Sequence, residues 1–261
     1  MNLYKIKITL IGAGNLATHL AVALHAKGIK ISEVYSRNLK NAETLSKKIN
    51  ASLVTDILNF SDSKADLFII AVPDDCISKV MVESVFPDKS FVVHTSGSMP
   101  LSIIEKEGCE TGVFYPLQTF SKGKEVDFSQ VPICIEANSP MLSRLLKILA
   151  ETIGQKAYEI SSDDRKYLHL AAIFACNFTN YLLSQSEEIL AEKSLPLEIL
   201  KPLIKETLQK AVEIGPKNAQ TGPAQRGDKQ VILKHLELLE GKPIQKEIYE
   251  IFTKNIMKKA L

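Results

Sequence analysis

The sequence predicts an α/β domain over residues 1–160 followed by an all-α domain over residues 161–261. Strand-like apolar runs alternate with helical patterns in the first part, an order typical of a mainly parallel sheet covered by helices. Only helical patterns follow in the second part. A glycine-rich turn comes directly after the first apolar run, where parallel-sheet domains connect a strand to a helix.

The strands of the first domain are expected at Lys5–Ile11, Ile31–Ser36, Leu67–Val72, Phe91–Thr95, Val113–Tyr115, Pro132–Glu136 and Ala157–Ile160. Helical patterns lie between several of these runs. Leu16, Leu20 and Leu24 recur at four-residue intervals and form one apolar face. The leucines between residues 142 and 149 form another.

The pattern changes after Ile160. Residues 161–164 (SSDD) make a favourable helix start, and the helical pattern then runs to about Lys193, on the order of 45 Å. Further helices are expected at Leu203–Ile214, Lys229–Glu240 and Lys246–Lys258, with a polar loop over residues 217–228. We expect this domain to form a homodimer, because its long apolar helix exposes more apolar surface than its short helices can cover. Light scattering at micromolar concentration tests that expectation.

Composition argues against several classes of protein. The 261 residues carry a formal net charge of +2, which gives no sign of a nucleic-acid or membrane partner. Cys76, Cys109, Cys134 and Cys176 form no CxxC pair, so neither a metal site nor a disulfide framework is indicated. The longest apolar stretch, Leu168–Leu183, is too short to span a bilayer. We expect a cytoplasmic protein without a signal peptide.

The first strand runs into a GxGxxA motif over residues 12–17. The first glycine of such a motif permits a tight turn, and the second lets the backbone approach a pyrophosphate. The third position takes a small residue, where the helix packs on the strand. N–H groups at the start of the helix bind the phosphates. We therefore predict a Rossmann dinucleotide site that includes Gly12, Gly14, Asn15 and Leu16; the alternative is a Rossmann domain that has lost its ligand.

The end of the second strand indicates which dinucleotide binds. An NAD site usually has a carboxylate there, which binds the ribose 2′-hydroxyl. Here the strand ends in Ser36 and Arg37, and Glu33 comes too early. A hydroxyl and a cation suit a 2′-phosphate, so the sequence favours NADP over NAD. The alternative for Arg37 is an ordinary surface residue.

Five further segments carry a resemblance to a known family. They are Ala71–Asp75 (AVPDD), His94–Ser98 (HTSGS), Phe114–Ser121 (FYPLQTFS), Arg165–Asn177 (RKYLHLAAIFACN) and Thr221–Asp228 (TGPAQRGD). With the glycine motif, they resemble the Rossmann-like proteins that carry a C-terminal domain of unknown function, number 2520, over nearly the whole chain. The resemblance implies the fold and a nicotinamide cofactor, which we expect Val72 and Pro73 to contact. It implies no substrate.

The layout is also similar, less closely, to pyrroline-5-carboxylate reductases and β-hydroxyacid dehydrogenases. Both pair an NADP-type Rossmann domain with a helical domain. In the dehydrogenases the entry helix carries a Lys-x-x-x-Asn pair, with the lysine as general acid/base. If Asn177 matches that asparagine, Ile173 occupies the lysine position, which argues against simple alcohol oxidation. The pyrroline reductases lack that lysine, and their Gly/Thr/Pro-rich loop is similar in composition to residues 221–223.

Four polar residues are candidates for the chemistry: His94, Ser96, His169 and Asn177. His94 and Ser96 end a strand at the carboxyl edge of the sheet, where ligands of open α/β sheets bind. His94 could act as an acid or base, or its ring could only hydrogen-bond the backbone of a strand-end turn. Ser96 could hold a carboxylate or carbonyl oxygen. His169 and Asn177 could face one side of the long helix, or pair with neighbouring helices.

These observations predict an NADP(H)-dependent oxidoreductase whose active site the helical domain closes. We expect it to reduce a small C=N or C=O compound, such as a carboxylate-bearing imine or keto acid. The proton would come from His94, His169 or an ordered water. Two alternatives stay open: a non-catalytic NADP(H)-binding module that senses redox state or regulates a partner, and a deazaflavin cofactor in place of nicotinamide.

Overall fold

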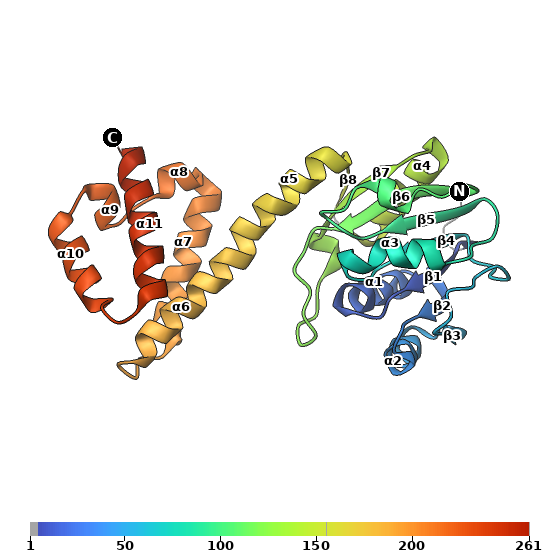
Figure 1. Ribbon diagram of the computed structural model, residues 1–261, viewed down its shortest axis with the longest axis horizontal. Helices are drawn as coiled ribbons and strands as arrows, with labels where there is room; N and C mark the ends of the chain where they lie inside the picture. Colours follow the sequence, from blue (N-terminus) through green and yellow to red (C-terminus); the bar gives the residue numbers. More distant parts are fainter. Residues whose placement is uncertain (1–4, 155, 261) are drawn as a thin grey trace. The chain divides into compact units, whose positions relative to one another are not determined.

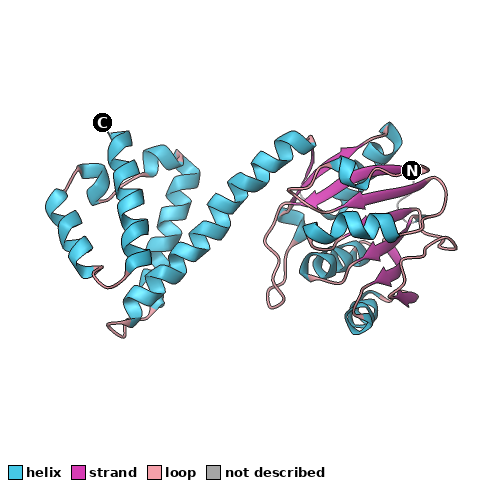
Figure 2. Ribbon diagram, viewed as in Figure 1, coloured by secondary structure: helices cyan, strands magenta, loops and turns pink. Residues whose placement is uncertain are grey.

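The computed structural model describes residues 5–154 and 156–260. It divides the chain into two compact units, Met1–Ala172 and Ile173–Leu261. The first unit is built on a β-sheet with helices, and the described part of the second consists of helices and their connections (Figures 1 and 2). This arrangement confirms the predicted fold class, an α/β Rossmann domain followed by an all-α region.

The described strands are β1 (Lys7–Ile11), β2 (Lys30–Tyr35), β3 (Leu53–Thr55), β4 (Leu67–Ile70), β5 (Ser90–His94), β6 (Cys109–Pro116), β7 (Pro132–Ala137) and β8 (Lys156–Glu159). They form one sheet in the order β3-β2-β1-β4-β5-β6-β7-β8. Neighbouring strands are parallel except β6 and β7, which are antiparallel. Every predicted strand is present, and β3 is an additional short strand at one edge.

Helices cover both faces of the sheet. On one face lie α1 (Asn15–Ala26), α2 (Leu39–Ile49) and α4 (Pro140–Ile153), and on the other lies α3 (Asp74–Glu83). Strand β4 is buried along its whole length because both its faces are covered. Its residues alternate between two apolar clusters, with Leu67 in the cluster of α1 and Phe68 in that of α3.

The register of the sheet brings four strand ends into line. Ile11 at the end of β1 pairs with Tyr35 of β2 and with Ile70 of β4, and Ile70 pairs with His94 of β5. The segments that follow these four residues therefore lie side by side at the carboxyl edge. This edge is where parallel α/β sheets bind their ligands.

The predicted long helix consists of α5 (Ser162–Ala172), a π-helical turn over Ile173–Phe178, and α6 (Thr179–Ala191). The two compact units divide at Ala172, later than the change of sequence pattern at Ile160. The reason is that the first turns of α5 pack on the sheet domain. Buried Arg165 donates from Nη1 to Glu136 Oε2 at 2.5 Å and from Nη2 to the Met99 carbonyl at 2.7 Å.

The second unit continues with α7 (Lys201–Ile214), α8 (Pro216–Ala219), α9 (Pro223–Arg226), α10 (Lys229–Leu238) and α11 (Pro243–Ala260). The expectation of a loop over residues 217–228 was wrong in part, because α8 and α9 each begin on a proline, which suits a first helical turn.

Many apolar side chains of the second unit are exposed. Among its described residues only Gln185, Ala224 and Leu239 are buried. Large apolar side chains such as Leu203 and Val212 are exposed within the chain. The predicted homodimer would cover such surface and stays a prediction. Of the helices in the described residues, none is long and apolar enough to cross a membrane.

Candidate active site

The glycine turn after β1 can be made only with glycine at position 12. Gly12 has a φ of +124°, a backbone conformation that L side chains rarely adopt. A Cβ atom at Gly12 would lie 2.2 Å from the carbonyl oxygen of Ala71, the residue that directly follows β4. The third motif position, Ala17, is fully buried where α1 packs on the sheet. Both positions have the steric roles that the motif predicts.

Gly14 leaves open space at the start of α1. It is the N-cap residue, with a φ of −80°, and a Cβ atom there would meet nothing within 4 Å. No side chain caps α1, and its first turn has no acidic residue. The first N–H groups of the helix and its positive dipole end are therefore available to an anion such as a pyrophosphate.

A cavity of about 540 Å³ extends from this turn to the ends of β2 and β5. Its lining includes every residue predicted to bind the cofactor: Gly12, Gly14, Asn15, Leu16, Ser36, Arg37, Val72 and Pro73. Ser96, predicted for the chemistry, lines the same cavity together with Thr95. The volume lies in the range typical of ligand pockets. The residues present therefore fit an extended dinucleotide.

The β2 end of the cavity carries an uncompensated cation. Arg37 is exposed and forms no salt bridge with any described residue. Burial raises the pKa of Tyr35; the Arg37 cation opposes that shift, whereas the Glu83 and Asp56 carboxylates add to it. Glu33 instead accepts hydrogen bonds from Thr9 Oγ1 at 3.0 Å and Ser63 Oγ at 3.1 Å. These bonds hold its carboxylate within the fold, so Glu33 gives no NAD-type ribose contact.

His94, at the β5 end, is fully buried, and its Nδ1 accepts the Ser96 N–H at 3.1 Å. Burial lowers the pKa of His94 to about 4, and the Arg165 cation adds to this effect, whereas the Pro100 carbonyl opposes it. The ring is therefore neutral at pH 7, with its proton on Nε2. His94 is not among the residues that line the cavity. The geometry favours the backbone-anchoring alternative over a proton donor.

The depressed pKa of His94 predicts a loss of stability in acid. An unfolded histidine takes up a proton near pH 6.5, whereas the folded ring resists protonation until about pH 4. This contribution to stability is thus present above pH 6.5 and lost as the pH falls toward 4, by about 2–3 kcal/mol. His94→Asn keeps an acceptor for the Ser96 N–H and cannot titrate. Urea unfolding at pH 7 and pH 4.5 should show a smaller acid loss in the variant; equal losses would contradict this account.

A polar array surrounds Ser96. Its Oγ accepts the N–H groups of Ser98 at 3.1 Å and Met99 at 3.0 Å, and it lies 3.4 Å from Ser98 Oγ, to which it can donate its proton in a long hydrogen bond. Ser98 Oγ donates to Asp74 Oδ2 at 2.5 Å. Asp74 also lines the cavity. The sequence had not singled out Asp74 as a site residue, although it directly follows Pro73 at a strand end.

His169 lies half-buried on α5, and its Nδ1 is 3.0 Å from the hydroxyl of Tyr115 at the end of β6. Tyr115 is a residue that the sequence did not single out as part of the site. Both side chains lie against Gly97, the neighbour of Ser96. The fourth catalytic candidate, Asn177, is exposed in the π-helical turn of the second unit, and its role stays a prediction.

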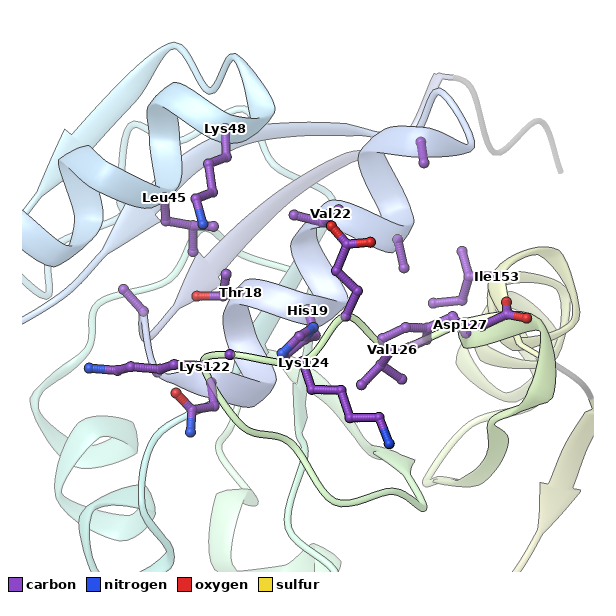
Figure 3. Close-up of a pocket in the computed structure, with 18 of the residues that line it drawn as sticks. Thr18, His19, Val22, Leu45, Lys48, Lys122, Lys124, Val126, Asp127 and Ile153 are labelled. Carbon is purple, nitrogen blue, oxygen red and sulfur yellow. The ribbon is translucent and has the colours of Figure 1, made fainter.

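A second cavity, of about 950 Å³, shares Gly14 and Asn15 with the first (Figure 3). Helices α1 and α2 line it together with the loop that carries Lys122 and Lys124. That loop is bound to α1, because Asn15 Nδ2 donates to the Phe120 carbonyl at 3.2 Å. The side chain of Asn15 is thus bound to the loop. We therefore expect its backbone N–H, and not its side chain, to make the predicted contact with a phosphate.

Comparisons with known proteins match two family models to this chain. Residues 131–256 match the model of a domain of unknown function, number 2520, and residues 7–96 match that of the coenzyme F420-dependent NADP oxidoreductases. No curated protein matches the sequence significantly.

Solved structures extend the likeness to the whole chain. A candidate NADP oxidoreductase of Bacteroides fragilis is 40% identical with a TM-score of 0.88, and the match covers 98% of this chain and 100% of that one. A protein of Thermotoga maritima is 24% identical with a TM-score of 0.81, over 97% and 99% of the two chains. A pyrroline-5-carboxylate reductase of Coxiella burnetii shares the fold at 17% identity and a TM-score of 0.58, over 97% and 96%. This chain therefore belongs to the family of Rossmann-like oxidoreductase-fold proteins with the C-terminal domain of unknown function 2520.

Proposed function

We propose that the protein is an NADP(H)-dependent reductase of a small C=N or C=O compound that carries a carboxylate. One observation carries the proposal: a single cavity connects the glycine turn to Arg37 at one end and to Ser96 at the other. In a Rossmann site the adenosine ribose lies at the end of the second strand, which leaves the Ser96 end to the nicotinamide. NADPH, when bound, supplies a hydride to the unsaturated carbon of the substrate.

The groups at the Ser96 end suit such a substrate. Reduction of C=N or C=O needs a proton on the nitrogen or oxygen as the carbon receives hydride. His169 is the proposed donor, because its half-buried ring can exchange protons with water, whereas the ring of His94 is buried and neutral. The Ser96 hydroxyl is the proposed donor to the substrate's carboxylate, which would replace its long hydrogen bond to Ser98 Oγ.

The choice of NADP(H) is tested at Arg37. A charge-assisted contact with the 2′-phosphate contributes about 1.5–3 kcal/mol, or roughly tenfold to over a hundredfold in affinity. We expect NADPH to bind at least about tenfold more tightly than NADH. Arg37→Ala should remove most of this preference by weakening NADPH binding alone. Fluorescence titration with both dinucleotides measures the two affinities.

The matched control is Arg144→Ala, which removes the same charge from an exposed site on α4 outside the cavity. It should leave both affinities unchanged. Equal affinities for NADPH and NADH in the native protein, or an undiminished preference in Arg37→Ala, would show that Arg37 is only a surface residue. Because residues 7–96 match a coenzyme F420-dependent family, a deazaflavin is the third ligand to titrate.

A further inference from the structure

The Tyr115–His169 pair touches the backbone of the cavity wall. A Cβ atom on Gly97 would lie 2.6 Å from Tyr115 Cζ and 2.7 Å from His169 Nδ1, so the pair occupies the space that a side chain at position 97 would need. Gly97 directly follows Ser96, which lines the cavity. The pair is therefore within one residue of the proposed nicotinamide end.

The two rings are held in a defined geometry. The Tyr115 side chain is buried, with 8% of the residue's surface exposed. Its hydroxyl lies 3.0 Å from Nδ1, and the rings meet edge to face at 72°. Since Tyr115 belongs to the sheet and His169 to α5, this contact fixes the histidine ring relative to the strand ends. Of the described hydrogen bonds, none involves Nε2 of His169.

We propose that Tyr115 is a positioning residue for His169, and this inference rests on the proposed function. The Tyr115 oxygen accepts the Nδ1–H of His169, so the exchangeable proton is carried on Nε2. In the reaction, Nε2 of the charged ring gives its proton to the substrate nitrogen or oxygen as the carbon receives hydride. The Nδ1–H stays on the Tyr115 oxygen, and the neutral ring regains a proton from water.

Two charged residues belong to elements around the pair, Arg165 to α5 and Asp74 to the start of α3. Arg165 lies one turn earlier on α5 and is bound to Glu136. Asp74 is bound to Ser98, beside Gly97. Both charged groups already have hydrogen-bond partners of their own. We therefore expect removal of the Tyr115 hydroxyl to remove the hydrogen bond to the histidine ring and to leave these two interactions in place.

Tyr115→Phe tests the proposal, because it keeps the buried ring and removes only the hydroxyl. One lost hydrogen bond to the charged ring corresponds to a decrease in kcat of about tenfold. The NADPH Kd should stay unchanged, because neither ring lines the dinucleotide cavity.

The chain offers a matched control in a second tyrosine–histidine pair. His235 Nδ1 lies 2.8 Å from the Tyr249 hydroxyl, and these rings meet edge to face at 83°. Neither residue lines either cavity. Tyr249→Phe should leave both kcat and the NADPH Kd unchanged. If Tyr115→Phe behaves like Tyr249→Phe in both respects, the proposal is overturned and the hydroxyl is only structural.

Histidine-ring NMR of the native, cofactor-free protein gives a test that needs no variant. The proposal requires neutral His169 to carry its proton on Nδ1; a proton on Nε2 would overturn it. Failure of the proposed function is separate and visible. If the native protein binds NADPH but reduces no substrate, both the proposed function and the role of Tyr115 are wrong. If turnover is normal but neutral His169 carries its proton on Nε2, only the role of Tyr115 is wrong.

Discussion

Replacement of Gly14 by aspartate should stabilise the protein and prevent dinucleotide binding. Gly14 already has the extended backbone of an N-cap residue, with φ −80° and ψ −168°, and space for a side chain. An aspartate there would cap the uncapped start of α1 and complement its dipole, which stabilises a folded protein by about 1 kcal/mol. The same carboxylate would accept hydrogen bonds from the N–H groups that we expect to bind the pyrophosphate, and its negative charge would repel the pyrophosphate.

The expected loss of affinity is large because several charge-assisted contacts disappear together. At about 1.5–3 kcal/mol for each contact, the loss of two weakens NADPH and NADH alike by more than about a hundredfold. Urea unfolding measures the gain in stability, and fluorescence titration measures the loss of binding. A variant that is more stable and yet binds the dinucleotides more weakly has a blocked site and not a damaged fold.

Two controls separate the causes. Gly14→Asn adds a neutral capping side chain of the same size and should lose less affinity than Gly14→Asp. Gly123→Asp adds the same charge on the nearby loop, at a position where a Cβ atom also meets nothing within 4 Å, and should bind NADPH nearly as the native protein does. Native affinity in Gly14→Asp would show that the cofactor does not lie on this turn.

His169→Ala should lower kcat by at least about a hundredfold, the usual effect of removing a general acid. The NADPH Kd should hardly change, because His169 does not line the dinucleotide cavity. Steady-state turnover gives the first quantity and equilibrium titration the second. The loss should exceed that in Tyr115→Phe, since one variant removes the donor and the other only its partner.

His235→Ala is the matched control, because it deletes the histidine of the other tyrosine–histidine pair. It should leave kcat unchanged. A His169→Ala variant that unfolds more easily yet turns over at the native rate would mark His169 as a structural residue of α5. His94→Asn should likewise retain turnover, since its ring only anchors the Ser96 backbone.

The sheet was largely predictable because its strands are buried on both faces. Such strands appear in the sequence as apolar runs between turns, as Leu67–Ile70 shows. Strand β3 escaped notice because it has three residues and lies at the edge of the sheet, where no residue in it is buried. The π-helical turn Ile173–Phe178 was equally hidden, since one shifted hydrogen-bond register leaves the apolar pattern of a helix intact.

The glycine turn of the proposed cofactor site could be predicted from the sequence, whereas the surroundings of the two candidate histidines could not. The glycine motif acts over neighbouring residues, so its spacing alone defines the turn. The choice between His94 and His169 depends on burial, which is decided by elements far apart along the chain. The contacts of His169 with Tyr115 and of Arg165 with Glu136 join α5 to the sheet across long sequence separations. No local sequence pattern predicts such long-range contacts.

The most direct test of the account is a substrate screen that follows the absorbance of NADPH. Cyclic imines and keto acids that carry a carboxylate are the substrates to include. The native protein should oxidise NADPH with at least one of them, and Gly14→Asp should show no turnover with the same compound. Saturating, tight binding of NADPH without turnover on any compound would contradict a reductase and would instead support a redox sensor.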